Sequence, residues 1–174
     1  MRRPGVASAP ETRSLPEMIR ILAVYLGNIC RSPAAEAAIR RAATDAGVAV
    51  EVDSAGTGRY HLGEPPHPRS VAAAARVGLE VTGTARQVDR SDFDRHDLIL
   101  AMDHRNFEDL LALAPDETAK AKVRLFRSFD PNADAGDVPD PYYGTDDDYR
   151  RMIEVILPAA AGVVGHLANS PPLG

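Results

Sequence analysis

The sequence has 174 residues, of which 44% are hydrophobic and 26% are charged. These proportions are typical of one soluble globular domain and exclude wholesale disorder. With 20 basic and 25 acidic residues the formal net charge is -5, which disfavours a uniformly basic nucleic-acid-binding protein. A single cysteine excludes an internal disulfide and a cysteine-rich metal site. No apolar run approaches the roughly 18 residues that span a bilayer, so we expect a cytoplasmic protein without membrane partners.

Both ends of the sequence are predicted to lie outside the folded domain. Residues 1–17 contain three prolines and no apolar periodicity, which indicates a disordered N-terminal extension without a secretory signal. The end of the sequence, Asn-Ser-Pro-Pro-Leu-Gly at 169–174, is predicted to be a tail because two prolines prevent a helix from continuing. The folded domain is therefore expected over residues 18–168.

Strand-like and helix-like segments alternate within this domain. Short apolar runs predict strands at residues 19–24, 48–52, 97–102 and 123–126. Helices are predicted at residues 32–45, 68–77, 104–112 and 146–166, the last with a kink at Pro158. This order predicts an α/β single-domain three-layer sandwich, with a four-stranded parallel sheet flanked by helices on both faces. Ligands are then expected at the carboxyl ends of the strands.

The segment after the first strand carries the main chemical signal. It reads Val-Tyr-Leu-Gly-Asn-Ile-Cys-Arg-Ser-Pro over residues 24–33 and leads into the first helix, for which Ser32 is the expected N-cap. A strand–loop–helix junction directs backbone N–H groups and the positive end of a helix dipole at one point. Arg31 adds a planar guanidinium that can hold two oxygens of a phosphate. On this pattern alone, an ordinary turn between strand and helix remains an equal alternative.

Several further motifs are similar to those of the low-molecular-weight protein-tyrosine phosphatases. The loop resembles that family's phosphate loop, V-C-x-G-N-x-C-R-S-P. Later matches are Ser-Ala-Gly-Thr at 54–57, Tyr-His-Leu-Gly at 60–63, Ala-Arg-Gln at 85–87, Asp-Leu-Ile-Leu-Ala-Met-Asp at 97–103 and Val-Pro-Asp-Pro-Tyr-Tyr-Gly at 138–144. The ordered matches extend over about 150 residues, from Met18 to the last helix.

The resemblance implies two-step hydrolysis of phosphotyrosine through a cysteinyl-phosphate, without a cofactor or a metal. The expected partners are a phosphotyrosine-containing protein or aryl phosphate, and free phosphate. Arg31 would clamp the phosphate, Ser32 would hydrogen-bond the nucleophile and Asp140 would be the general acid. Asn28 would hold the strained loop, with help from Ser54. The expected substrate-binding residues are Leu26, Gly27, Asn28, Ile29, Cys30, Arg31, Ser32, Tyr142 and Tyr143.

The sequence departs from the family at the nucleophile itself, because the catalytic position holds Tyr25. A phenol ionises near pH 10 and attacks phosphorus poorly. From Cα, a cysteine sulfur reaches roughly 2.8 Å and a tyrosine hydroxyl roughly 6.5 Å. The ring must therefore either enter the anion site or rotate away and distort the loop. By analogy with nucleophile deletions in proteases, we expect a loss of roughly a millionfold in turnover.

Three hypotheses follow. The first is a family member without competent chemistry, either a natural pseudophosphatase or a nucleophile variant. The second is a non-catalytic phosphotyrosine-binding, anion-binding or docking module. The third is an enzyme that forms a phosphotyrosyl intermediate on Tyr25. Cys30, beside Arg31 at a helix entrance where thiol pKa values are lowered, is a less favoured substitute nucleophile, and a small buried side chain is its default role.

Overall fold

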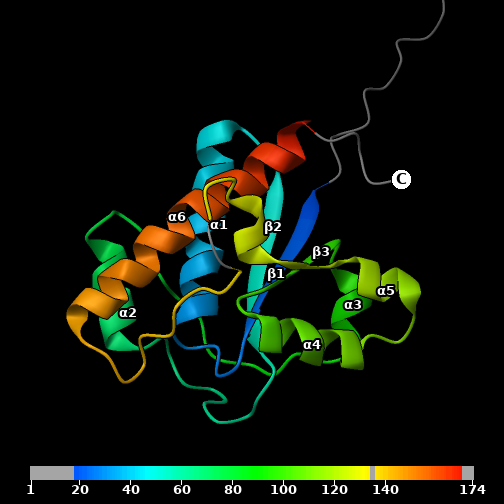
Figure 1. The fold of residues 1–174 in the computed structure, drawn as a ribbon, viewed down its shortest axis with the longest axis horizontal. Coiled ribbons are helices and arrows are strands. Elements are labelled where there is room, and N and C mark those ends of the chain that lie inside the picture. The colour runs from blue at the N-terminus through cyan, green and yellow to red at the C-terminus, as the bar shows by residue number, and fades with distance from the viewer. Residues whose placement is uncertain (1–17, 134–135, 170–174) are drawn as a thin grey trace, which may run out of the picture.

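The computed structural model describes residues 18–133 and 136–169 (Figure 1). The predicted N-terminal extension lies outside the described residues, as does the predicted tail apart from Asn169, which is helical. The elements in chain order are β1 (Ile19–Tyr25), α1 (Arg31–Ala46), β2 (Val50–Gly56), α2 (Pro68–Ala75), α3 (Asp92–Arg95), β3 (Leu98–Ala101), α4 (His104–Leu113), α5 (Glu117–Ala121), β4 (Val123–Leu125), the 3₁₀ helix η1 (Phe126–Phe129) and α6 (Asp146–Asn169).

The four strands form one parallel sheet in the order β2-β1-β3-β4, which confirms the predicted architecture. β1 lies at the point where strand order changes direction, since β2 pairs with one of its edges and β3 with the other. In such sheets the crevice beyond the carboxyl end of this strand is the usual ligand site. The segment that follows Tyr25 begins at this crevice.

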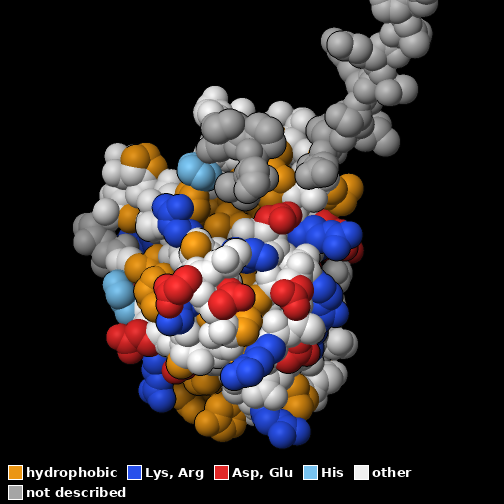
Figure 2. All heavy atoms as spheres, turned by 90° about the vertical axis from the view of Figure 1, so that its right-hand side faces the viewer, with side chains coloured by type: hydrophobic (Ala, Val, Ile, Leu, Met, Phe, Trp, Pro, Cys, Tyr) orange, Lys and Arg blue, Asp and Glu red, His pale blue; other side chains and the backbone are white. Residues whose placement is uncertain are grey.

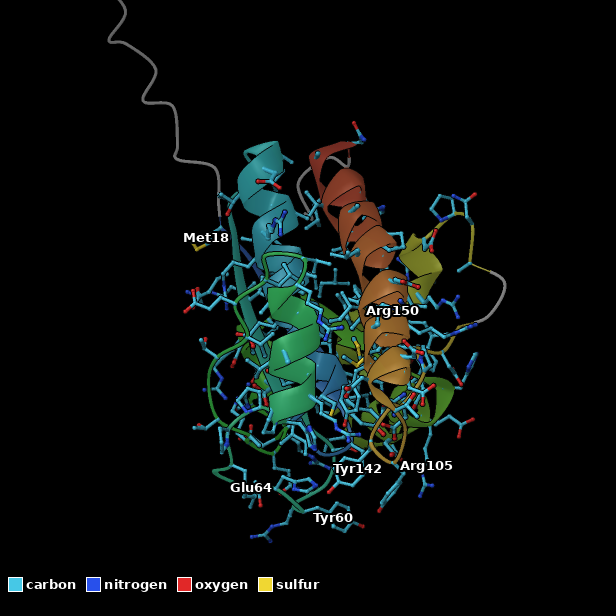
Figure 3. All side chains as sticks on the ribbon, turned by 90° about the vertical axis from the view of Figure 1, so that its left-hand side faces the viewer. Met18, Tyr60, Glu64, Arg105, Tyr142 and Arg150 are labelled. Carbon is cyan, nitrogen blue, oxygen red and sulfur yellow. The ribbon has the colours of Figure 1, made fainter. Side chains whose placement is uncertain are left out.

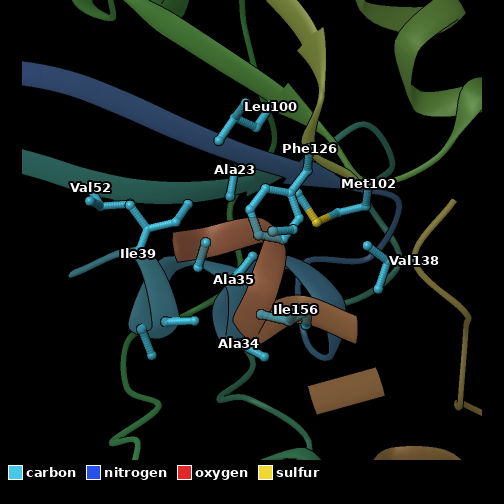
Figure 4. Packing of buried hydrophobic residues seen from close by; sticks show 14 of the residues in the cluster. Ala23, Ala34, Ala35, Ile39, Val52, Leu100, Met102, Phe126, Val138 and Ile156 are labelled. Atoms are coloured by element: carbon cyan, nitrogen blue, oxygen red, sulfur yellow. The ribbon is translucent and has the colours of Figure 1, made fainter. Parts of the chain in front are cut away.

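Alternating side chains of β1 enter separate cores on the two faces of the sheet. Ile21 and Ala23 pack in the larger core with α1, α2, α6 and η1, whereas Leu22 and Val24 pack in the smaller one against α3, α4 and α5. All four side chains are fully buried. A strand buried on both faces reads as a continuous apolar run, which is the pattern that predicted it. Figure 4 shows the larger core, with Phe126 between the sheet and α6.

The predicted boundaries differ from the observed ones where local signals competed. β2 starts later than predicted and continues to Gly56, because its last residues pair with β1 as far as Tyr25. The helix predicted to start at Ser32 begins one residue earlier, its N-cap is Cys30, and no side chain caps it. The prediction of Ser32 as N-cap was therefore wrong. The short helices α3, α5 and η1 were not predicted, because four or five residues are too few to show a 3.6-residue period.

Helix α6 has a property that the sequence analysis did not anticipate. Among the described residues it is a helix long and apolar enough to cross a membrane by length and composition, with a mean hydropathy of 1.4 over its best window. It nevertheless acts as a core helix, with one face buried against α1, α2 and η1. Its first turn carries three aspartates, which interact favourably with the helix dipole.

On the face of the molecule shown in Figure 2, acidic and basic side chains are interspersed.

Candidate active site

The segment between β1 and α1 curls at the carboxyl end of the sheet. Asn28 has a φ of 55°, in the left-handed region that asparagine tolerates better than most residues. Its Nδ2 donates to the Ser54 carbonyl at 3.4 Å, and its Oδ1 accepts from the Ser32 hydroxyl at 2.8 Å. All three residues are buried. These contacts tie the loop to β2 on one side and to the first turn of α1 on the other.

Tyr25 ends β1 and directs its ring toward the acid loop, which we define as residues 137–144. Its hydroxyl donates to Asp140 Oδ2 at 2.5 Å. Burial and then the hydrogen bond to Asp140 raise the pKa of the phenol far above its ordinary value of 10.0. The guanidinium carbon of Arg31 lies 3.3 Å from the centroid of the Tyr25 ring. The ring was expected either to enter the anion site or to rotate away from it. In the structure it lies against Arg31, one of the groups expected to hold the anion.

Arg31 is enclosed by protein groups. Its Nη1 donates to the Val138 carbonyl at 2.6 Å and lies 3.2 Å from Asp103 Oδ2. Its Nη2 lies 3.6 Å from Asp140 Oδ2, and the side chain is only 5% exposed. Two carboxylates, one carbonyl and one aromatic face therefore surround a single guanidinium.

The acid loop is held on both sides of Asp140. Upstream, the Val138 amide donates to the Met102 carbonyl at the end of β3, at 2.8 Å. Downstream, Asp140 Oδ1 accepts from the Tyr142 amide at 3.1 Å. His104, at the start of α4, contacts Asp137 Oδ1 through Nδ1 at 2.6 Å. The Asp140 side chain remains 42% exposed and faces the cleft described next.

A cleft of about 370 Å³ opens beside Tyr25. Its walls are mainly aromatic and aliphatic, and they come from the β1–α1 loop, the segment after β2 and the acid loop. The residues that line it are Tyr25, Leu26, Gly27, Ile29, Cys30, Tyr60, His61, Asp140, Tyr142 and Tyr143. Figure 3 shows Tyr60 and Tyr142 at the end of the molecule opposite Met18. This volume is within the range of small-molecule sites.

Cys30 is buried rather than poised for attack. Its side chain is 1% exposed, and its sulfur lies 3.9 Å from the Tyr149 hydroxyl. Burial raises the pKa of the thiol to about 11, and Arg31 lowers it by less. The expectation that the helix entrance lowers this pKa was wrong, because loss of hydration outweighs the nearby cation.

The structure brings together the side chains of Tyr25, Arg31 and Asp140, and Tyr142 and Tyr143 line the same cleft. Asp103 and the Val138 carbonyl contact Arg31 and were not predicted as its partners. Asp103 could have been found because it closely follows β3, at the same edge of the sheet as the loop. His61 was also missed as a lining residue. Within residues 18–133 and 136–169, no group of three His, Cys, Asp or Glu side chains could hold a metal ion.

The parallel sheet thus places an Asn-stabilised loop, an arginine and an opposing aspartate at one crevice. The family model of low molecular weight phosphotyrosine protein phosphatase matches residues 20–170, so the chain belongs to this family. A low molecular weight protein-tyrosine-phosphatase of Streptomyces coelicolor is 46% identical over 149 residues, which cover 83% of this chain and 91% of the relative.

Solved structures of other proteins share the fold, among them one from Entamoeba histolytica and one from Vibrio vulnificus. A protein tyrosine phosphatase of Entamoeba histolytica with Hepes in the active site is 36% identical, with a TM-score of 0.83 and coverage of 86% of this chain and 97% of the other. Vibrio vulnificus Wzb in complex with benzylphosphonate is 27% identical, with a TM-score of 0.75 and coverage of 85% and 98%. The similarity of the fold to these structures is consistent with the family match.

Proposed function

We propose that this chain is a low-molecular-weight tyrosine-phosphatase homologue in which phosphomonoester hydrolysis is absent or severely reduced. The observation that carries the proposal is Tyr25 at the nucleophile position, with its hydroxyl bound to Asp140. In a cysteinyl-phosphate mechanism a thiolate attacks phosphorus while an acid protonates the leaving phenol. Here a high pKa keeps the phenol protonated at neutral pH, so it is no substitute for a thiolate.

The other proposed roles follow the geometry of the loop. Arg31 and the backbone of residues 26–32 would bind the phosphate of a phosphotyrosine-containing protein or an aryl phosphate, or free phosphate. Asn28 and Ser54 support the loop through the hydrogen bond between them. Asp140 would be the general acid, and Tyr142 and Tyr143 would form the walls that contact the substrate ring. The composition and the family favour a cytoplasmic location, which cell fractionation tests.

The test compares hydrolysis of an aryl phosphate by the chain with Tyr25 and by Tyr25→Cys. A thiolate at position 25 can attack phosphorus, so the turnover of the cysteine variant should exceed that of the chain with Tyr25 by up to about a millionfold. Tyr25→Phe serves as a matched control, because it keeps the ring and removes only the hydroxyl. Turnover by the chain with Tyr25 that Tyr25→Phe abolishes would overturn the proposal and support the phosphotyrosyl route.

A second candidate is a non-catalytic phosphotyrosine-binding or anion-binding module. One observation favours it, because the buried Nε of Arg31 has no hydrogen-bond partner among the described residues. The contacts of Arg31 with two carboxylates weigh against it. Titration of the chain with phenyl phosphate separates the candidates. Binding without turnover, unaffected by the Tyr25→Cys exchange, would favour the module over a family member that has lost its nucleophile.

A further inference from the structure

A second cleft adjoins the one beside Tyr25, and the proposed function does not use it. It has a volume of about 350 Å³, and we call it the α4 cleft because that helix forms one of its walls. The residues that line it are Leu26, Thr57, Gly58, Tyr60, Gln87, Val88, Asp109, Leu110 and Leu113. Leu26 and Tyr60 line both clefts, whereas none of the described acid-loop residues lines this one. A ligand that extends from the first cleft past Leu26 or Tyr60 would therefore reach the α4 cleft.

The walls of the α4 cleft are largely apolar. Leu110 and Val88 are side chains of the smaller core, 0% and 6% exposed. Leu26 and Tyr60 are 38% and 76% exposed. A Cβ on Gly58 would lie 2.9 Å from the Tyr60 ring and 3.2 Å from Leu26 Cδ1, so these two side chains rest on the backbone of Gly58. The α4 cleft therefore offers apolar surface to the aliphatic part of a ligand.

One charged side chain, that of Asp109, lies among these apolar groups. It is exposed, and within residues 18–133 and 136–169 no cationic side chain forms an ion pair with it. An apolar wall beside a carboxylate complements an aliphatic stem with a cationic end, because lysine and arginine bury their stems and keep their charge in water. The exposed face of Tyr60 would attract the same cation. The α4 cleft thus has the chemistry of a subsite for a basic side chain.

We propose that the α4 cleft binds a lysine or arginine side chain of the same protein that presents its phosphotyrosine to the cleft beside Tyr25. The stem would contact Leu26 and Leu113, and the cation would face Asp109. Residues of an extended chain are spaced by about 3.3 Å, so a residue within about three positions of the phosphotyrosine can reach an adjoining cleft. The inference rests on the proposed function, because it takes a phosphotyrosine-containing protein as the ligand of the first cleft. It names a basic sequence beside the phosphotyrosine as the substrate class.

Matched peptides test the proposal by NMR titration of the isotope-labelled chain. In an alanine-based phosphotyrosine peptide, lysine or arginine is placed in turn at each position within about three residues of the phosphotyrosine. Norleucine, which keeps the stem without the charge, is the counterpart at each position. At one or more positions the basic peptide should bind about threefold to tenfold tighter than the norleucine peptide. Equal binding at every position, or amide shifts that leave residues 57–60, 87–88 and 109–113 unaffected, would overturn the proposal.

Two neighbouring carboxylates of α4 locate the bound cation. Asp109→Asn removes the carboxylate in the cleft, and Glu108→Gln, the matched control, removes the same charge from an exposed position outside it. The preference for the basic peptide should disappear in Asp109→Asn and persist in Glu108→Gln. An equal effect of the two variants would mean that the overall charge of the chain attracts the peptide, and it would overturn the proposal.

The basic residue and the phosphate are tested separately. Each peptide is also titrated with tyrosine in place of phosphotyrosine, and the preference for the basic residue should remain, because the α4 cleft would not contact the phosphate. Loss of the preference in this series would overturn the proposal. Equal binding of the tyrosine and phosphotyrosine peptides would contradict only the phosphate-binding role of Arg31. The hydrolysis assay with Tyr25→Cys is independent of both results, so either idea can fail alone.

Discussion

The hydroxyl of Tyr25 donates a 2.5 Å hydrogen bond to the carboxylate of Asp140, across 115 positions of sequence. The residue at the nucleophile position is thus joined to the residue expected to protonate the leaving group. A cysteine, whose side chain reaches roughly 4 Å less far, cannot make this contact from the same Cα. The substitution at position 25 therefore changes the environment of the acid as well as removing the nucleophile.

The Tyr25 phenol should make stability fall at high pH. Burial and the bond to Asp140 raise its pKa, so the folded state holds the proton more tightly than the unfolded chain. The resulting stabilisation is complete below about pH 10, where an unfolded tyrosine ionises, and is lost as the pH rises through the folded value. Urea unfolding between pH 8 and 11 should show the chain with Tyr25 losing stability relative to Tyr25→Phe above pH 10. Parallel pH profiles of the two proteins would contradict this.

The Cys30 thiol should be inert in the folded protein. It is 1% exposed, and burial raises its pKa to about 11, so little thiolate exists at pH 8. Alkylation by iodoacetamide at pH 8, followed by mass spectrometry, should be slow in buffer and fast in 8 M urea, a denaturing concentration chosen from typical midpoints. Fast modification of the native chain would show that the start of α1 opens readily.

Replacement of Asn28 should lower the unfolding free energy, and alanine should lower it more than glycine. Both Asn28→Ala and Asn28→Gly lose the bonds to Ser54 and Ser32, which we expect to cost about 1–3 kcal/mol of unfolding free energy. Only alanine adds the penalty of a φ of 55°, about 1 kcal/mol more. Urea denaturation of the two variants isolates the backbone contribution. Equal stability of the two would mean that the loop relaxes out of the left-handed region.

Two glycines of α6 should respond oppositely to alanine. A Cβ on Gly162 would lie against the Phe129 carbonyl oxygen, far inside van der Waals contact, whereas a Cβ on Gly165 meets nothing within 4 Å. Gly162→Ala should therefore destabilise the domain by about 1–3 kcal/mol. Gly165→Ala should stabilise it by up to about 1 kcal/mol, because alanine favours the helix. Thermal unfolding of both variants checks the pair, and a stable Gly162→Ala would mean that η1 moves away from α6.

The sheet and the long helices could be predicted because their sequence patterns are strong. β1 and β3 are apolar runs buried on both faces, and α6 repeats its apolar positions over 24 residues. The extent of β2 could not be predicted, since the polar residues Asp53 and Ser54 are strand residues only through pairing with β1. The start of α1 was missed because Ser32 hydrogen-bonds Asn28 instead of capping the helix.

The sequence motifs predict which residues form the site, but not how their side chains are arranged. The loop, Arg31 and Asp140 follow from the spacing of residues in the sequence. The direction of the Tyr25 ring does not, because it depends on where Asp140 and Arg31 lie in space. The same is true of Asp103, which caps α4 with one oxygen and contacts Arg31 with the other. The high pKa of the Cys30 thiol could not be predicted, because it results from burial, which the sequence pattern of a helix entrance does not show.

The packing of α1 against α6 has a consequence for biosynthesis. α1 is the first helix of the described domain and α6 is the last, and the two share the larger core. The second edge of β1 pairs with β3, which lies more than 70 residues later in the sequence. A nascent chain on the ribosome therefore cannot close this core until nearly all of the domain has emerged. Until then, the apolar faces of β1 and α1 remain exposed to solvent and to other molecules near the ribosome exit.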